Sequence, residues 1–77
     1  MSKFKIEGIS KISDIMKSIF RICAEKRIDF TVSYNDGSNE ARFDKKLKKV
    51  SINIGDLGDE NLLLTLEKME KEVRKES

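Results

Sequence analysis

The amino-acid sequence predicts an α+β fold, a two-layer sandwich in which two helices cover one face of an antiparallel sheet. Apolar residues recur at helical spacing in one segment near each end of the chain, and three short segments between them alternate apolar with polar residues. The predicted order is an optional short strand, a helix, three meandering strands and a helix. With 77 residues, 38% of them apolar, residues 1–77 are expected to form one small domain.

The first helix is predicted over residues 10–25. Ile12, Met16, Ile19 and Cys23 share one side of a helical wheel, and four more apolar residues widen that side: Ile9, Ile15, Phe20 and Ile22. A stripe of this width is expected to face the core. Ser10 or Ser13 is the expected N-cap, because a short hydroxyl side chain accepts a hydrogen bond from the first turn.

A short strand is predicted ahead of this helix. Phe4 and Ile6 alternate with charged residues, and Gly8 follows as a strand breaker. This segment would give the sheet a fourth strand; without it the sheet has three.

The first two strands of the meander are predicted as a hairpin. Residues 29–34 alternate apolar with polar side chains, and Asp36 and Gly37 are typical of a two-residue hairpin loop. In that register Phe30 faces Phe43, and Tyr34 lies in the core or at its edge. The remaining pairs are Val32 with Ala41 on the apolar face, and Thr31 with Arg42 and Ser33 with Glu40 on the polar face.

A third strand is predicted around residues 50–54, antiparallel to the second. Its apolar residues then face those of the second strand: Val50 with Phe43, and Ile52 with Ala41. The connection from Asp44 to Lys49 would bring four ammonium groups together at a tight tip, those of Lys45, Lys46, Lys48 and Lys49.

The last helix is predicted to begin at Asp59 or Glu60, because carboxylates favour the first turn of a helix. Its buried stripe consists of four residues spaced four, three and four apart: Leu62, Leu66, Met69 and Val73. Leu64 lies on the opposite side of the helix. Either Leu57 and the preceding turn fold over Leu64, or Leu64 and Leu63 meet another chain, which would give a homodimer through this helix.

The charges are numerous and nearly balanced. The chain has 16 basic and 14 acidic residues and a net charge of +2, so its overall attraction to nucleic acid or anionic membranes is weak. The basic excess lies before Asp56 and the acidic excess after it, which predicts a basic body and an acidic tail helix. No apolar run matches a membrane span or a secretory signal, so no membrane association and a cytoplasmic location are expected.

The residue types give little support for catalysis. The chain has no histidine and one cysteine, which disfavours general acid–base chemistry near neutral pH, a structural zinc site and an internal disulfide. Its four glycines form no phosphate-binding or dinucleotide-binding motif. Cys23 lies at the centre of the apolar helical face and is expected to be inert. We therefore expect no enzymatic activity, no catalytic residue, no cofactor and no metal.

The expected function is that of a non-enzymatic binding or regulatory module that occupies a surface of a partner protein. Three groups of residues are candidates for partner binding: Thr31, Glu40 and Arg42 on the polar sheet face, Lys45, Lys46, Lys48 and Lys49 at the tip, and Leu63 and Leu64 on the last helix. The alternative is a small nucleic-acid-binding accessory protein that uses the basic body and the lysine tip. The same lysines could serve only to keep the tip solvated. The lysine-rich, proline-free composition suggests a low-GC genome, and a phage or mobile element as the source.

Overall fold

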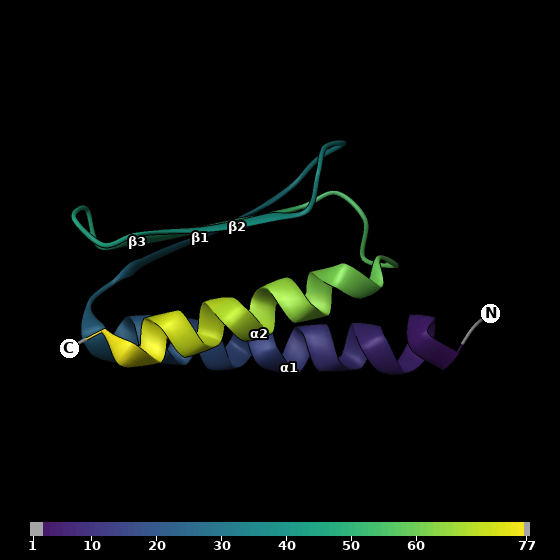
Figure 1. Ribbon diagram of the computed structural model, residues 1–77, viewed down its shortest axis with the longest axis horizontal. Coiled ribbons are helices and arrows are strands. Elements are labelled where there is room, and N and C mark those ends of the chain that lie inside the picture. Colours follow the sequence, from purple (N-terminus) through teal and green to yellow (C-terminus); the bar gives the residue numbers. More distant parts are fainter. Residues whose placement is uncertain (1–2, 77) are drawn as a thin grey trace.

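The computed structural model describes residues 3–76, with side chains from Gly8 onward. Two helices lie side by side against one face of a three-stranded sheet, which confirms the α+β class (Figure 1). The elements in chain order are α1 (Lys3–Lys26), β1 (Asp29–Tyr34), β2 (Glu40–Asp44), β3 (Lys49–Ile54) and α2 (Glu60–Lys75). No helix in this part of the chain is long and apolar enough to cross a bilayer.

Helix α1 begins earlier than predicted. Residues 3–8 are helical, so the strand predicted around Phe4 and Ile6 is wrong, and the side chains of these two residues lie outside the described ones. Ser10 and Ser13 lie inside α1 and cap nothing. Two apolar residues two positions apart are too few to establish a strand, and Ile6 lies three residues before Ile9, a helical spacing that continues the apolar stripe of α1.

Helix α1 ends in a Schellman motif. Arg27 adopts a left-handed conformation with φ 58°. The Ile28 N–H donates to the Cys23 carbonyl at 2.8 Å, and the Arg27 N–H donates to the Ala24 carbonyl at 3.4 Å. Cys23 and Ile28 are both buried, which supplies the apolar contact that accompanies this motif and turns the chain into β1.

The sheet is mixed, with strand order β1-β3-β2, so the predicted antiparallel meander is wrong. Strands β2 and β3 are antiparallel in the predicted register, with Phe43 opposite Val50 and Ala41 opposite Ile52. Strand β1 does not pair with β2. It runs parallel to β3, which sets Phe30 beside Val50 and Val32 beside Ile52. The alternation placed every apolar side chain on the correct face, but alternation does not determine which strand is the neighbour.

The segment between β1 and β2 crosses the end of β3. No described glycine has a positive φ, so Asp36 and Gly37 do not form the two-residue loop that a tight hairpin needs. The Gly37 backbone passes so close to Gly55 that a Cβ on Gly55 would overlap the Gly37 carbonyl oxygen. The Asn39 side chain fixes this crossing, because its Oδ1 accepts hydrogen bonds from the Gly55 N–H at 2.7 Å and the Asp56 N–H at 2.9 Å.

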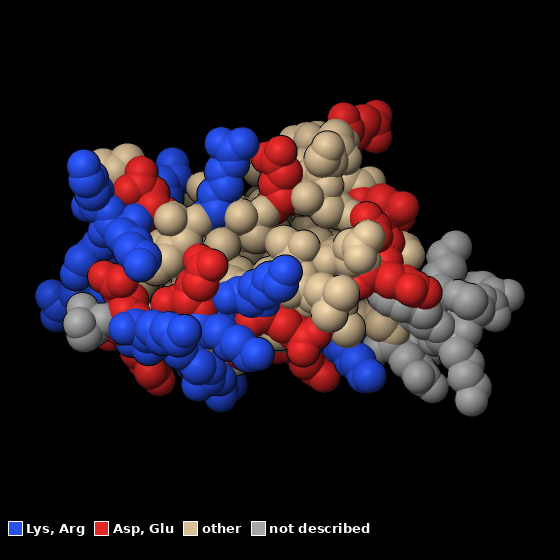
Figure 2. Space-filling view, viewed as in Figure 1, with Lys and Arg blue, Asp and Glu red and all other residues tan. Residues whose placement is uncertain are grey.

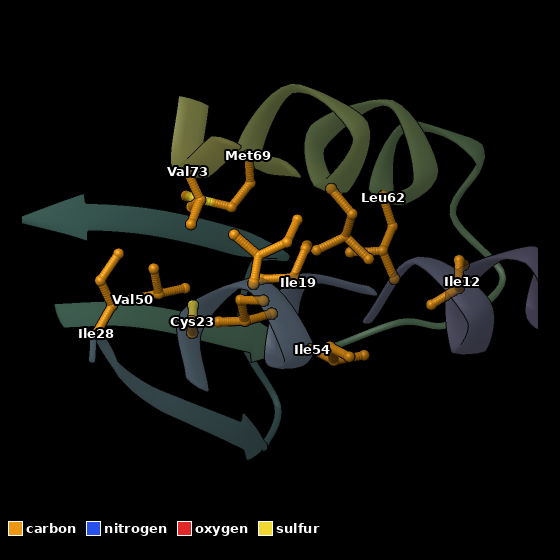
Figure 3. Packing of buried hydrophobic residues seen from close by; sticks show 12 residues of the cluster. Ile12, Ile19, Cys23, Ile28, Val50, Ile54, Leu62, Met69 and Val73 are labelled. Atoms are coloured by element: carbon orange, nitrogen blue, oxygen red, sulfur yellow. The ribbon is translucent and has the colours of Figure 1, made fainter. Parts of the chain in front are cut away.

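The core lies between the sheet and the helix layer. Figure 3 shows Ile19, Val50 and Leu62 pointing into this space from α1, β3 and α2. The buried apolar residues are Ile12, Ile19, Ile22, Cys23, Ile28, Val50, Ile52, Ile54, Leu62, Leu66, Met69 and Val73. They confirm the predicted stripe of α2. Three of them belong to β3, and the strand that buries most inward side chains takes the centre of the sheet.

The two helices run in the same direction (Figure 1). Polar side-chain contacts join them. The Ser18 hydroxyl donates to a Glu70 carboxylate oxygen, and Arg74 lies 3.5 Å from the same carboxylate. The Lys26 ammonium donates to the Arg74 carbonyl at 2.9 Å and to the Glu76 carbonyl. A cation at these carbonyls stabilises the C-terminus of α2. At the other end, the Asp59 carboxylate accepts from the Asn61 N–H at 2.9 Å, as expected of the N-cap.

Candidate functional site

The lysine tip forms as predicted. Residues 45–48 make the turn between β2 and β3, and the side chains of Lys45, Lys46, Lys48 and Lys49 are all exposed. Figure 2 shows Lys and Arg gathered at the end of the molecule where the tip and the C-terminus of α2 lie, with acidic side chains among them. Lys49 is paired across the sheet with Asp29 on one side and Asp44 on the other. These carboxylates reduce the positive potential at the base of the tip.

Basic residues of the predicted acidic tail helix lie near those of the predicted basic body. The last turn of α2 carries Arg74 and Lys75, and the C-terminus of α2 lies at the same end of the molecule as the lysine tip (Figure 1). The basic residues at this end therefore come from two parts of the chain, the turn between β2 and β3 and the last turn of α2.

The outer face of the sheet is polar and uncovered by either helix (Figure 1). Thr31 and Arg42 lie in one cross-strand row with Ser51 between them, and Glu40 lies in the next row beside Asn53. Arg42 and Glu40 form an ion pair at 3.5 Å in which both side chains are mostly exposed. An exposed pair of this kind adds little stability. The face offers polar groups to a partner but no large apolar side chain.

Leu63 and Leu64 lie in the helix layer, away from the outer sheet face. Leu63 is half-buried beside Ile15 in a shallow depression between the helices. Leu64 is 57% exposed, so neither Leu57 nor the turn before α2 covers it. The predicted site residues thus lie on three surfaces, of which the lysine tip and the polar sheet face adjoin, because Lys49 shares the outer face of β3 with Ser51.

A fourth surface, which the sequence did not predict, is an apolar groove beside α1. Of the six large apolar side chains exposed in the described part of the chain, four line it: Ile9, Phe20, Tyr34 and Leu57. Met16 and Ala24 contribute further apolar surface, and the groove measures about 690 Å³. We refer to these six residues, with Lys17 and Arg21, as the α1–β1 groove.

Both layers of the fold build the α1–β1 groove. Phe20 of α1 packs edge to face on Phe30 of β1, with ring centroids 5.7 Å apart. Tyr34, at the other end of β1, is 66% exposed, which corrects its predicted place in or at the edge of the core. Tyr34 pairs with Ile54 in a row that β2 does not reach, because β2 begins opposite Asn53. Tyr34 is the residue of β1 that lines the groove, and the other lining residues come from α1 and from the segment after β3.

The charges at the α1–β1 groove have one sign. Lys17 and Arg21 are the charged residues among its lining, and both are exposed. They are four residues apart, so they lie one helical turn apart on the same flank of α1. An apolar floor with a basic rim suits an apolar segment that carries acidic residues.

Groups suited to catalysis or metal binding are sparse. Among residues with described side chains, no three of His, Cys, Asp and Glu come close enough to hold a metal ion. Cys23 is buried in the core as predicted, and burial raises the pKa of its thiol, which keeps the thiol protonated and unreactive.

Comparison with known proteins gives no relative: no protein-family model, curated protein or solved structure matches this chain.

The sequence does not predict the groove, because the apolar stripe of α1 is typical of one buried face. Ile12, Ile19 and Ile22 are buried, whereas Ile9 is 37% and Phe20 is 59% exposed. The stripe is wider than the part of α1 that the sheet and α2 can cover. The signal was present in that width, since a helix facing one core needs a narrower stripe.

Proposed function

We propose that this protein is a non-enzymatic binding module that occupies the surface of a partner protein. The observation that carries the proposal is the α1–β1 groove, where Ile9, Phe20, Tyr34 and Leu57 meet at one place on the surface. Large exposed apolar side chains are usually scattered on a monomeric protein, and a cluster of them marks a contact surface. Aromatic residues flanked by arginine are the composition that protein interfaces favour.

The remaining surfaces support a contact with protein more than a reaction. The polar sheet face holds an exposed ion pair, and the thiol of Cys23 is buried and protonated. A binding module needs only a rigid scaffold and an exposed patch. The core supplies the scaffold, because Ile19, the residue that precedes Phe20, is fully buried.

The experiment is retention of a partner from lysate of the cells that encode the protein. Wild type should retain a partner protein after nuclease treatment and at high salt, because an apolar contact is weakly screened. A variant with Phe20→Asp and Tyr34→Ser should lose that partner. Leu47→Ser is the matched control, since Leu47 is 71% exposed but lies at the tip, and it should retain the partner. Loss of all retention after nuclease treatment would contradict the proposal.

A nucleic-acid-binding function is the second candidate, favoured by the four exposed lysines on one turn. Phosphate contacts release counterions, so such binding weakens steeply as salt rises. Replacing Lys45, Lys46, Lys48 and Lys49 with Ser should leave folding intact, because all four side chains are exposed, and should abolish retention on a heparin or DNA column. Equal retention of this variant and wild type would remove the tip as a nucleic-acid site.

A further inference from the structure

Strand β1 has a free edge that faces away from the rest of the sheet. It pairs with β3 on one side and with no other strand in the described part of the chain. The Asp29 N–H donates to the Lys48 carbonyl at 2.9 Å, so the backbone groups of Asp29 point toward β3. Backbone groups alternate in direction along a strand, and those of Phe30, Val32 and Tyr34 therefore point outward at the free edge.

From Phe30 to Tyr34 this edge carries none of the features that usually prevent strand addition. Such features are charged side chains, lysine above all, proline and a bulge. Strand β1 has the sequence DFTVSY, and its pairing with β3 is unbroken over six residues. Its one charge is Asp29, at the end farthest from Tyr34. A further strand could pair with the edge from Phe30 to Tyr34 without disturbing the fold.

The α1–β1 groove borders the same edge. Phe20 reaches Phe30, and Tyr34 itself lines the groove. A strand added to β1 would continue the sheet, and its alternate side chains would point toward the helix layer, where the apolar groove lies. The opposite side chains would continue the polar outer face of the sheet.

We infer that β1 and the α1–β1 groove bind an extended segment of the partner protein as an added strand. The segment has apolar side chains at every second position, which enter the groove, and acidic residues that contact Lys17 and Arg21. This inference rests on the proposed function and specifies its binding mode. It corresponds to strand addition, in which backbone hydrogen bonds give affinity and side-chain pockets give specificity.

The charges disfavour a second copy of this chain as the occupant. Two copies joined edge to edge through β1 would place their helices on the same side of one continuous sheet. The Lys17 and Arg21 side chains of both copies would then lie on the same side of the joined sheet, and the lining of neither groove offers a carboxylate to offset them. Like charges brought together in this way oppose association.

A helical ligand is disfavoured for a different reason. A helix uses its own backbone groups internally, so it would leave the outward backbone groups of β1 without hydrogen-bond partners from the ligand.

Selection from a library of random twelve-residue peptides displayed on phage, with the full chain as bait, tests the inference. Enriched peptides should carry apolar residues at i, i+2 and i+4 together with acidic residues. A synthetic copy of an enriched peptide should bind about tenfold or more weakly to Phe20→Asp, and about tenfold more weakly to the double variant Lys17→Glu and Arg21→Glu. Leu47→Ser and Arg42→Glu are the controls, with changes below about twofold.

Amide hydrogen exchange of the protein with this peptide reports the binding mode directly. The amides of Phe30, Val32 and Tyr34 should exchange fast in the free protein and slowly in the complex. Those of Ala41 and Phe43, at the other edge, should exchange fast in both. This readout does not depend on a variant that could fail to fold.

The outcomes separate the two proposals. Apolar residues at i, i+3 and i+4, or unchanged exchange in β1, would overturn strand addition, and the proposed function would stand if the lysate partner still depends on Phe20. Failure to enrich any peptide would also overturn strand addition. If lysate retention failed as well, the proposed function would fall with it. A dimer in sedimentation whose β1 amides are already slow would show that a second copy fills the edge.

Discussion

The two edges of this sheet differ in chemistry, although both strands contribute apolar side chains to the same core. Strand β2 carries a charge at every outward position, namely Glu40, Arg42 and Asp44. Strand β1 carries Asp29, Thr31 and Ser33 at the corresponding positions, so its one charge lies at the end of the strand farthest from Tyr34, and β1 lies beside the α1–β1 groove. Charge on an edge strand opposes pairing with another chain. The β2 edge is therefore protected against pairing with another chain along its whole length, whereas the β1 edge carries no charge from Phe30 to Tyr34.

The helices reinforce this difference. Helix α2 packs over β2, and helix α1 packs over β1. Helix α2 buries a narrow stripe and presents the exposed Leu64 alone. Helix α1 presents Ile9 and Phe20 on the flank that faces the groove. Exposed apolar side chains of α1 therefore lie near the β1 edge.

The largest effect is expected from Ile19→Asp. Ile19 is fully buried, so the carboxylate would lose its water without gaining a partner, at a cost of about 3–5 kcal/mol, and the chain should unfold. Phe20→Asp is the matched change at the next position. Its side chain is 59% exposed, and the loss should be about 1 kcal/mol. Thermal melts check both, and equal losses would mean that α1 does not separate a core face from a groove face.

The next effect concerns the crossing that makes β1 and β2 the two edges. Gly55→Ala should cost roughly 2–3 kcal/mol, because the new methyl group meets the Gly37 backbone, which cannot move aside as a side chain would. Gly58→Ala is the control. The nearest atom to its added Cβ is an Asp56 side-chain oxygen at 3.3 Å, and the change should stay within about 1 kcal/mol. Urea unfolding compares them. If Gly55→Ala were as stable as wild type, the result would favour a tight hairpin between β1 and β2 over the crossing.

The smallest effect is expected on the β2 side, at Leu64. If α2 mediates a homodimer, Leu64→Lys should convert the dimer to a monomer and lower the melting temperature, and the melting temperature of wild type should depend on protein concentration. Sedimentation at two concentrations decides this. A wild-type monomer at both concentrations would leave the α1–β1 groove as the main apolar contact surface in the described part of the chain.

Local patterns predicted the elements whose signals were unambiguous. The cap at Asp59 follows from residue type, and the stripe of α2 and the register of Phe43 with Val50 follow from spacing. All three are confirmed. The parallel pairing of β1 was not predictable in this way. Its inward residues satisfy a hairpin with β2 and a parallel pair with β3 equally well, and the choice depends on the crossing of Gly37 over Gly55, which is a contact between distant backbone segments.

The candidate functional site shows the same limit of prediction from local sequence patterns. The exposure of the lysine tip was predicted, because it follows from a turn between two confirmed strands. The groove was not, because its residues come from α1, β1 and the segment after β3, and Phe20 and Tyr34 both look like core residues in their own elements. The assembled fold shows that Phe20 and Tyr34 both remain mostly exposed, because no other described residue covers them fully.

Amide hydrogen exchange across the three strands of the free protein tests the central claim most directly. With β3 in the centre, every amide from Val50 to Ile54 should exchange slowly, because β3 bonds to a neighbour on each side. Phe30, Val32 and Tyr34 in β1, and Ala41 and Phe43 in β2, should exchange fast. Slow exchange at Ala41 and Phe43, with fast and slow amides alternating along β3, would place β2 in the centre and contradict the account.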